Sequence, residues 1–167
     1  MTHSFGASGT AATQATAHSS SMPDTVAAAF AASAERWPDR PFVAVLPETA
    51  AAYGIAAGEL TYAQAQQRIA GLRRAYVDAG YGHGHRVGLL LDNRPAFFLH
   101  WFALNALGVS VVPISSDLRA AELEYLIGHS EVALVVAMPQ RHAGLRGATQ
   151  AARRPLGLIA DGDAPPA

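Results

Sequence analysis

The sequence has 167 residues, half of them hydrophobic, which is enough to form the core of one domain of ordinary size. Its formal charge of −1 gives no electrostatic reason to expect a nucleic acid or an acidic membrane as partner. The absence of cysteine excludes a disulfide framework, a thiol nucleophile and a Cys-ligated zinc site, and all twelve basic residues are arginine.

Residues 1–22 consist mainly of Ser, Thr, Ala and Gly, so we expect a disordered tail that can bury little apolar surface. This segment lacks the basic start and apolar run of a secretory signal, and it has none of the arginines of a mitochondrial presequence. No segment of the chain approaches the ~18 consecutive apolar residues of a membrane span. We therefore expect a cytoplasmic protein whose one domain occupies residues 23–167.

The first predicted elements are short. A helix is expected over residues 24–37, with Asp24 as its N-cap and a proline after its end. A strand is expected over residues 41–46, and a second over residues 59–62. The Ala- and Gly-rich residues 48–58 between them are interpreted as a loop, so the two strands would pair as a hairpin with a long connection.

The next segment carries a clear helix pattern that begins at Thr61. Gln64 follows three residues later, and together they fit a capping box. Apolar residues then repeat at three- and four-residue steps, and Gly80 supplies a left-handed residue after the helix. The pattern predicts an amphipathic surface helix with four charged side chains turned to solvent: Arg68, Arg73, Arg74 and Asp78.

Residues 86–91 are apolar at consecutive positions, which is typical of a central parallel strand covered on both faces. Asn93 can cap the following helix, in whose first turn Pro95 is tolerated. This helix is apolar on nearly every side and stops at Gly108, so we expect it to be largely buried.

Strands and helices continue to alternate to the end of the sequence. They are a strand over 109–112, a helix over 118–127, a strand over 132–137, a helix over 141–152 and a strand over 156–160. The alternation predicts an α/β fold with a mostly parallel sheet and flanking helices. Because the sequence stops directly after a strand, we expect a truncated domain whose sheet has an uncovered face or edge.

The glycine-rich run 80–85 invites comparison with phosphate-binding loops. It follows a helix and precedes a strand, whereas dinucleotide loops follow a strand and open a helix. An exposed connection is therefore the favoured interpretation. His83 and His85 within it form a possible metal-ligand pair, but no third ligand lies near them in the sequence.

Other polar residues have an ordinary structural role as the favoured interpretation. Ser115 and Ser116 follow a strand, at the edge where α/β sheets bind ligands, but a role in the turn into the next helix is favoured over catalysis. Arg94 is interpreted as solvated rather than phosphate-bound. His100 is expected in the core or an interface, and His129 at a helix C-terminus. The residues alone predict no catalytic, cofactor-binding or metal-binding site.

Several segments nevertheless resemble, in series, the N-terminal part of AMP-forming acyl-CoA synthetases, in the adenylate-forming superfamily. Leu60-Thr61-Tyr62 is similar to the first core motif of that superfamily, and Leu104 to Pro113 to the second. The residues Val111-Val112-Pro113-Ile114-Ser115 are nearer to the acyl-CoA ligases than to peptide-synthetase adenylation domains. The aromatic run that starts at Trp101 is similar to that of ligases acting on short or carnitine-like acids. Ala106 and Ser115 depart from the Lys and Asn that are frequent at these positions.

The resemblance implies an enzyme that uses ATP, Mg²⁺ and coenzyme A to convert a carboxylic acid first to an acyl-adenylate and then to a thioester. In that family the phosphate loop, the adenine and Mg²⁺ contacts and the C-terminal lid with its lysine lie after everything present here. We therefore expect a ligase fragment that binds no cofactor by itself and is inactive without a missing C-terminal remainder. One alternative is a non-catalytic α/β interaction module that complements a separately encoded remainder. A self-sufficient small nucleotide-binding domain is a third.

Overall fold

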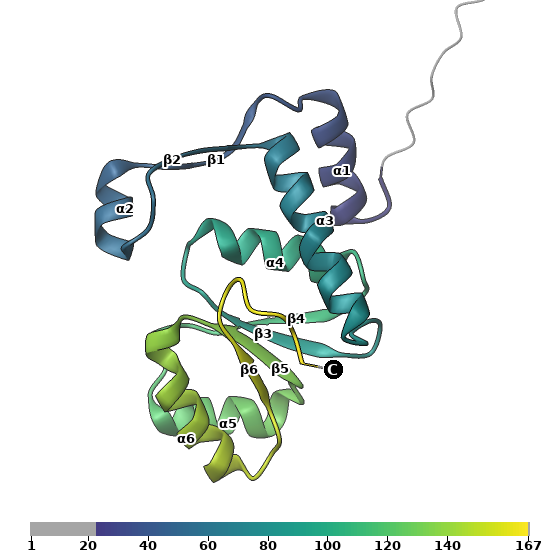
Figure 1. Ribbon diagram of the computed structural model, residues 1–167. Helices are drawn as coiled ribbons and strands as arrows, with labels where there is room; N and C mark the ends of the chain where they lie inside the picture. The colour runs from purple at the N-terminus through teal and green to yellow at the C-terminus, as the bar shows by residue number, and fades with distance from the viewer. Residues whose placement is uncertain (1–22, 167) are drawn as a thin grey trace, which may run out of the picture.

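The computed structural model describes residues 23–166, so the predicted tail over 1–22 lies outside the described residues. Helices and strands alternate through this range (Figure 1). The elements are α1 (Val26–Arg36), β1 (Pro41–Val45), α2 (Pro47–Tyr53), β2 (Gly58–Thr61), α3 (Tyr62–Asp78), β3 (Arg86–Leu90), α4 (Pro95–Asn105), β4 (Ser110–Pro113), α5 (Ala120–Ser130), β5 (Leu134–Ala137), the 3₁₀ turn η1 (Pro139–Arg141), α6 (His142–Ala152) and β6 (Gly157–Ile159).

The central sheet has four strands in the order β4-β3-β5-β6, and all neighbouring pairs are parallel. The strand β3 pairs on both sides, and Val87, Leu89 and Leu90 on it are fully buried. The sequence prediction of a central parallel strand and of an α/β fold with a mostly parallel sheet is confirmed.

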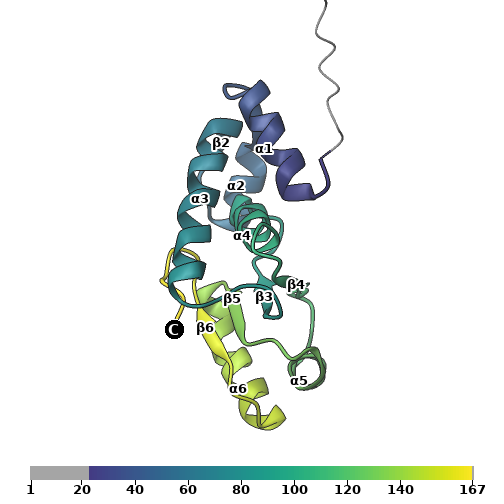
Figure 2. The same cartoon turned by 90° about the vertical axis from the view of Figure 1, so that its right-hand side faces the viewer.

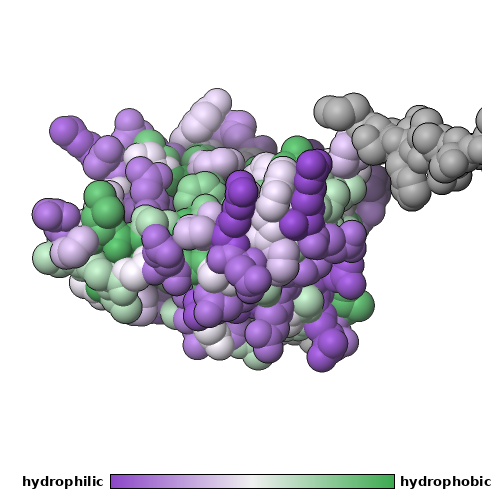
Figure 3. All heavy atoms as spheres, turned by 90° about the horizontal axis from the view of Figure 1, so that it is seen from above, coloured by the Kyte–Doolittle hydropathy of each residue, from purple (hydrophilic) through white to green (hydrophobic). Residues whose placement is uncertain are grey.

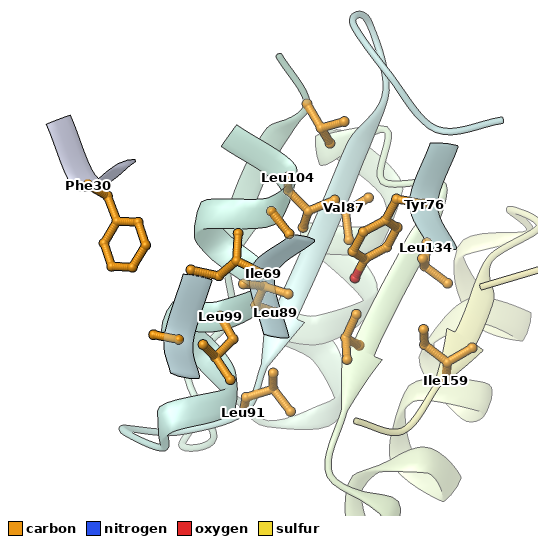
Figure 4. Packing of buried hydrophobic residues seen from close by; sticks show 14 of the residues in the cluster. Phe30, Ile69, Tyr76, Val87, Leu89, Leu91, Leu99, Leu104, Leu134 and Ile159 are labelled. Atoms are coloured by element: carbon orange, nitrogen blue, oxygen red, sulfur yellow. The ribbon is translucent and has the colours of Figure 1, made fainter. Parts of the chain in front are cut away.

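Helices cover both faces of this sheet (Figures 1 and 2). One buried cluster joins α1, α3 and α4 to the strands, with Tyr76, Leu104 and Leu134 in its centre (Figure 4). A second cluster joins α5 and α6 to the opposite face through Ile127, Val135 and other buried residues. Of the expected uncovered face or edge, residues 23–166 show open edges, because β4 and β6 each pair on one side, while both faces are covered.

The strands β1 and β2 form the predicted antiparallel hairpin, which extends away from the main sheet (Figure 1). The predicted loop over residues 48–58 is wrong, because α2 occupies Pro47–Tyr53. Proline is favoured at the first position of a helix, and alanine is the strongest helix former. Gly54, with φ 61°, ends the helix in the left-handed conformation. A run that is rich in alanine was thus misinterpreted as irregular.

The helix caps partly differ from the predictions. Thr25, rather than Asp24, caps α1, because its hydroxyl oxygen accepts from the backbone N–H of Ala28 at 3.1 Å. Arg94, rather than Asn93, is the N-cap of α4. The residue before a proline favours extended backbone. Because Pro95 is the first helical residue, Arg94 directly before it is the N-cap.

The prediction that α4 is largely buried holds for one side only. Leu99, His100, Ala103 and Leu104 are buried, whereas Phe98 is 38% exposed. Apolar side chains of α4 therefore lie on the surface of the molecule as well as in its core.

The predicted helix after Thr61 is confirmed as α3, with both halves of its capping box present and Gly80 at φ 85° directly after it.

Figure 3 views the molecule from above Figure 1 and shows a mainly hydrophilic surface with scattered hydrophobic residues. Among residues 23–166, no helix combines the length and apolar character that crossing a membrane requires.

Candidate functional site

The carboxyl edge of the sheet contains a topological switch point. The strands β3 and β5 lie side by side. The chain leaving β3 enters α4 on one face, whereas the chain leaving β5 enters η1 and α6 on the other. Open α/β sheets bind their ligands at such points, where the two connections diverge. This edge is therefore the first place to look for a site.

A hollow of about 320 Å³ opens at this point, and we call it the switch-point cleft. Segments far apart in the sequence build its wall: the hairpin, α3, the β3–α4 connection, the end of β5 and the residues after β6. Its apolar lining includes Ile55, Leu91, Leu99 and Met138, and its charged lining consists of Arg68, Arg94 and Asp161.

Arg94 lines this cleft and is held there by Tyr53, the last residue of α2. Its Nη2 donates to the backbone carbonyl of Tyr53 at 2.8 Å, and its guanidinium lies 5.8 Å from the centre of the Tyr53 ring. Its Nε–H is buried and has no hydrogen-bond partner within residues 23–166. The sequence interpretation of Arg94 as a solvated side chain is therefore wrong, because the hairpin and α2 pack over it.

A hydrogen-bond network adjoins the cleft, buried at Tyr76 and His100 and open to solvent at Asp161, whose side chain is 54% exposed. The Tyr76 hydroxyl on α3 lies 2.7 Å from Nδ1 of His100 on α4, and Nε2 of His100 lies 3.0 Å from Oδ1 of Asp161 after β6. Tyr76 is 0% exposed and His100 is 1% exposed, so the predicted core position of His100 is confirmed. The network joins three segments that are distant in the sequence.

The pKa values of Tyr76 and Asp161 indicate which groups of this network carry hydrogens. Burial raises the pKa of its phenol, and the Asp161 carboxylate adds to the effect, so the hydroxyl stays protonated. Because the Asp161 carboxylate can only accept, Nε2–H of His100 donates to it, and Nδ1 shares a hydrogen with the Tyr76 hydroxyl. This hydrogen bond from His100 holds the pKa of Asp161 below its ordinary value, and Arg68 and Arg94 contribute to the same shift.

The serines lie in a separate hollow on the same edge, lined by Ser115, Ser116, Asp117 and the β3–α4 residue Asp92. Ser115 Oγ accepts from the backbone N–H of Asp117 at 3.2 Å, so it shapes the turn that leads toward α5. Within the described chain, no histidine lines this hollow, so neither serine has a nearby imidazole as general base.

The remaining candidate residues lie away from both hollows. The run 80–85 is the expected connection from α3 to β3, and the imidazole of His85 bonds the backbone of Gly82. His129 lies in the last turn of α5, as expected, with Nδ1 2.9 Å from the carbonyl of Tyr125. Among residues 23–166, no three His, Cys, Asp or Glu side chains are grouped so that they could hold a metal ion.

Sequence reasoning missed Asp161 and assigned Arg68 to solvent alone. Asp161 follows β6 directly, in the position that drew attention to the serines after β4, so the same rule applied to every strand would have found it. No signal in the sequence pairs Tyr76 with His100, because their contact depends on how α3 and α4 pack.

The comparisons with known proteins agree with one another. The family model "AMP-binding enzyme" matches residues 30–166. The sulfoacetate–CoA ligase of Cupriavidus necator is 32% identical over 129 residues, which are 77% of this chain and 24% of that protein. The crotonobetaine/carnitine–CoA ligase of Salmonella typhimurium is 32% identical over 101 residues, 60% of this chain and 20% of that protein. The chain thus spans about a quarter or less of the length of these relatives.

Solved structures resemble the fold. A fatty acyl CoA synthetase of Mycobacterium tuberculosis aligns with a TM-score of 0.68 and 22% identity, over 81% of this chain and 26% of that one. The N-terminal subdomain of Klebsiella oxytoca NpsA aligns with a TM-score of 0.57 and 17% identity, over 68% and 27%. At this level of identity the likeness shows the fold alone.

Proposed function

The chain belongs to the AMP-binding enzyme family, and from this membership we propose that residues 23–166 are the N-terminal part of an ATP-dependent carboxylic acid–CoA ligase. The observation that carries the proposal is the match of the family model over residues 30–166. The curated relatives act as CoA ligases on small polar acids, which supports thioester formation from an acid of this kind.

The described residues do not fit ATP and Mg²⁺. A triphosphate needs several cationic or backbone donors, and the sequence has no lysine and no glycine-rich loop between a strand and a helix. In nucleotide sites Mg²⁺ is held largely by the phosphates themselves, so its binding here would depend on the same missing phosphate-binding residues. We therefore propose that binding of ATP, Mg²⁺ and coenzyme A requires further polypeptide, and that this chain supplies scaffold.

A chimaera tests this scaffold role. The matching segment of the sulfoacetate–CoA ligase would be replaced by residues 24–160 of this chain, and sulfoacetate-dependent release of AMP would be measured. A ligase that lacks the segment altogether serves as the control. We expect the chimaera to release AMP well above that control. A chimaera that melts cooperatively and binds ATP but releases no AMP would contradict the proposal.

An apolar surface favours a second candidate, the interaction module that joins a separately encoded remainder. Phe42, Phe97, Phe98 and Trp101 line one hollow between β1 and α4, and almost all of its surface is carbon. Contiguous exposed aromatic side chains are typical of protein interfaces, and this group supports the second candidate on that ground. Co-expression with candidate downstream fragments distinguishes a split ligase from a non-catalytic module. A split ligase regains activity only when both pieces are present, whereas a module with another role binds the fragment and the complex shows no ligase activity.

A further inference from the structure

Helix α5 has two apolar faces, and the rest of the described chain covers only one of them. Leu123 and Ile127 are buried in the second cluster, against the sheet. On the outer face lies a shallow hollow of about 600 Å³, and Figure 2 shows α5 end-on at the margin of the molecule. Steps of three and four residues place the residues that line it on one side of the helix. We call these α5 residues the outer stripe: Ala121, Glu122, Tyr125, Leu126, His129 and Ser130.

The centre of the outer stripe is an exposed but ordered aromatic pair. Tyr125 is 67% exposed, and its ring stacks on the His129 ring with 4.0 Å between the centroids. Nδ1 of His129 donates to the backbone carbonyl of Tyr125 at 2.9 Å. A side chain that is already held in place loses little conformational entropy on binding, and exposed apolar patches are typical of interaction surfaces. The outer stripe therefore has the properties of a docking surface.

The charged groups at the two ends of the outer stripe indicate the partner. Glu122 lies near the N-terminal end of α5 and His129 near its C-terminal end. Oε2 of Glu122 accepts from the backbone N–H of Arg119 at 2.8 Å, which leaves Oε1 for a partner. Nδ1 of His129 is used within the helix, so Nε2 is left, and in the imidazolium form it donates to a carboxylate. Each stripe thus offers one acceptor and one donor.

A second copy of the chain satisfies both groups at once. Two α5 helices can cross antiparallel about a twofold axis that passes between Tyr125 and Leu126. The Glu122 end of each stripe then lies against the His129 end of the other copy. A parallel arrangement would instead place the two Glu122 carboxylates side by side, where they repel. The outer stripe is therefore self-complementary, as a twofold-symmetric interface requires.

We propose that the outer stripe of α5 is the interface of a weak, twofold-symmetric dimer of this chain. The Tyr125 rings form its centre, and a Glu122–His129 pair closes each end. Because a single helix of 11 residues presents the stripe, the interface belongs to the small, transient class. The proposal stands on the geometry of α5 and does not depend on the ligase function proposed above.

Sedimentation equilibrium of the 167-residue chain between about 1 μM and 1 mM tests this proposal. We expect the mass to rise reversibly with concentration from that of a monomer toward that of a dimer. Tyr125→Ser removes the central aromatic group and should raise the Kd of the dimer about tenfold or more. Val77→Ser removes an exposed apolar side chain of α3 and should leave the Kd unchanged.

Charge variants test the antiparallel arrangement at constant ionic strength. An exposed ion pair strengthens association by up to about fivefold, and twofold symmetry counts it twice. We therefore expect His129→Glu to raise the Kd about tenfold and His129→Arg to lower it about threefold. The double variant Glu122→Arg with His129→Glu should regain most of the loss, because opposite charges meet again. His83→Glu makes the same substitution on the exposed connection from α3 to β3 and should have no effect.

Circular dichroism establishes that each variant is folded before its Kd is compared. The proposal is overturned if the wild-type chain stays monomeric over the whole concentration range, or if Tyr125→Ser and Val77→Ser have the same Kd. It is also overturned if His129→Glu and His129→Arg change the Kd in the same direction, because the stripe would then not pair opposite charges.

Discussion

Replacing Tyr76 by phenylalanine tests the buried network between α3, α4 and the segment after β6. The substitution keeps the ring, which packs edge-on against Tyr81, and removes only the hydroxyl that lies 2.7 Å from Nδ1 of His100. Nδ1 then remains as a buried polar atom without a hydrogen-bond partner, since His100 is 1% exposed. Such an orphaned group costs about 1–3 kcal/mol, so we expect Tyr76→Phe to lower the free energy of unfolding by about 2 kcal/mol.

The assay is reversible urea unfolding followed by circular dichroism, together with a thermal melt. A loss of this size lowers Tm by roughly 4–8 °C in a domain of this length. Tyr125→Phe is the matched control, because Tyr125 is 67% exposed, and we expect its loss to stay within about 0.5 kcal/mol. Equal stabilities of the two variants would refute the assigned hydrogen bond. A His100 ¹⁵N spectrum that shows no hydrogen on Nε2 would refute the hydrogen bond that Nε2 donates to Asp161.

Three further predictions concern stability. Because the pKa of Asp161 is lowered in the folded state, its contribution is fully present above the ordinary pKa of a carboxyl group and is lost as the pH falls through the lowered value. Urea titrations between pH 2 and 7 should therefore show a steeper acid loss in the wild type than in Asp161→Asn, and parallel curves would contradict this. Gly88→Ala would place a Cβ 2.8 Å from Cδ1 of Ile114, which directly follows the neighbouring strand β4, so we expect a loss of about 1–3 kcal/mol by overpacking. Gly71→Ala, on helix α3 with open space around it, should instead stabilise by about 0.5–1 kcal/mol, and a loss at both glycines would refute the packing argument. Thr61→Ala removes the cap of α3 and should cost about 1 kcal/mol in the same urea assay, and an unchanged midpoint would show that the cap contributes nothing.

Sequence patterns predicted most of the helices and strands, because the physical cause of each pattern lies within a few neighbouring residues. The capping box at Thr61, the left-handed Gly80 and the consecutive apolar residues of β3 are each encoded within a few residues. The errors arose where the composition was ambiguous. Alanine suits a helix as well as a loop, so α2 was missed, and the apolar residues of α4 did not reveal which side faces outward.

The candidate site was largely beyond the sequence because its parts meet only in the folded chain. Arg68, Arg94 and Asp161 come from α3, the start of α4 and the end of β6, and no spacing rule links them. The sequence did indicate the edge of the sheet where a site is expected, since the carboxyl ends of parallel strands lie together. The resemblance to acyl-CoA synthetases rested on motifs in series, and the family match over residues 30–166 confirms it.

Whether this chain can activate an acid without further polypeptide is tested most directly by ATP–pyrophosphate exchange. The purified 167-residue chain would be assayed with a panel of carboxylic acids, beside a protein-free blank and a full-length CoA ligase. We predict an exchange rate equal to that of the blank for every acid, because the sequence has no lysine and no glycine-rich loop between a strand and a helix to hold the triphosphate. Acid-dependent exchange well above the blank would contradict the assignment of this chain as scaffold.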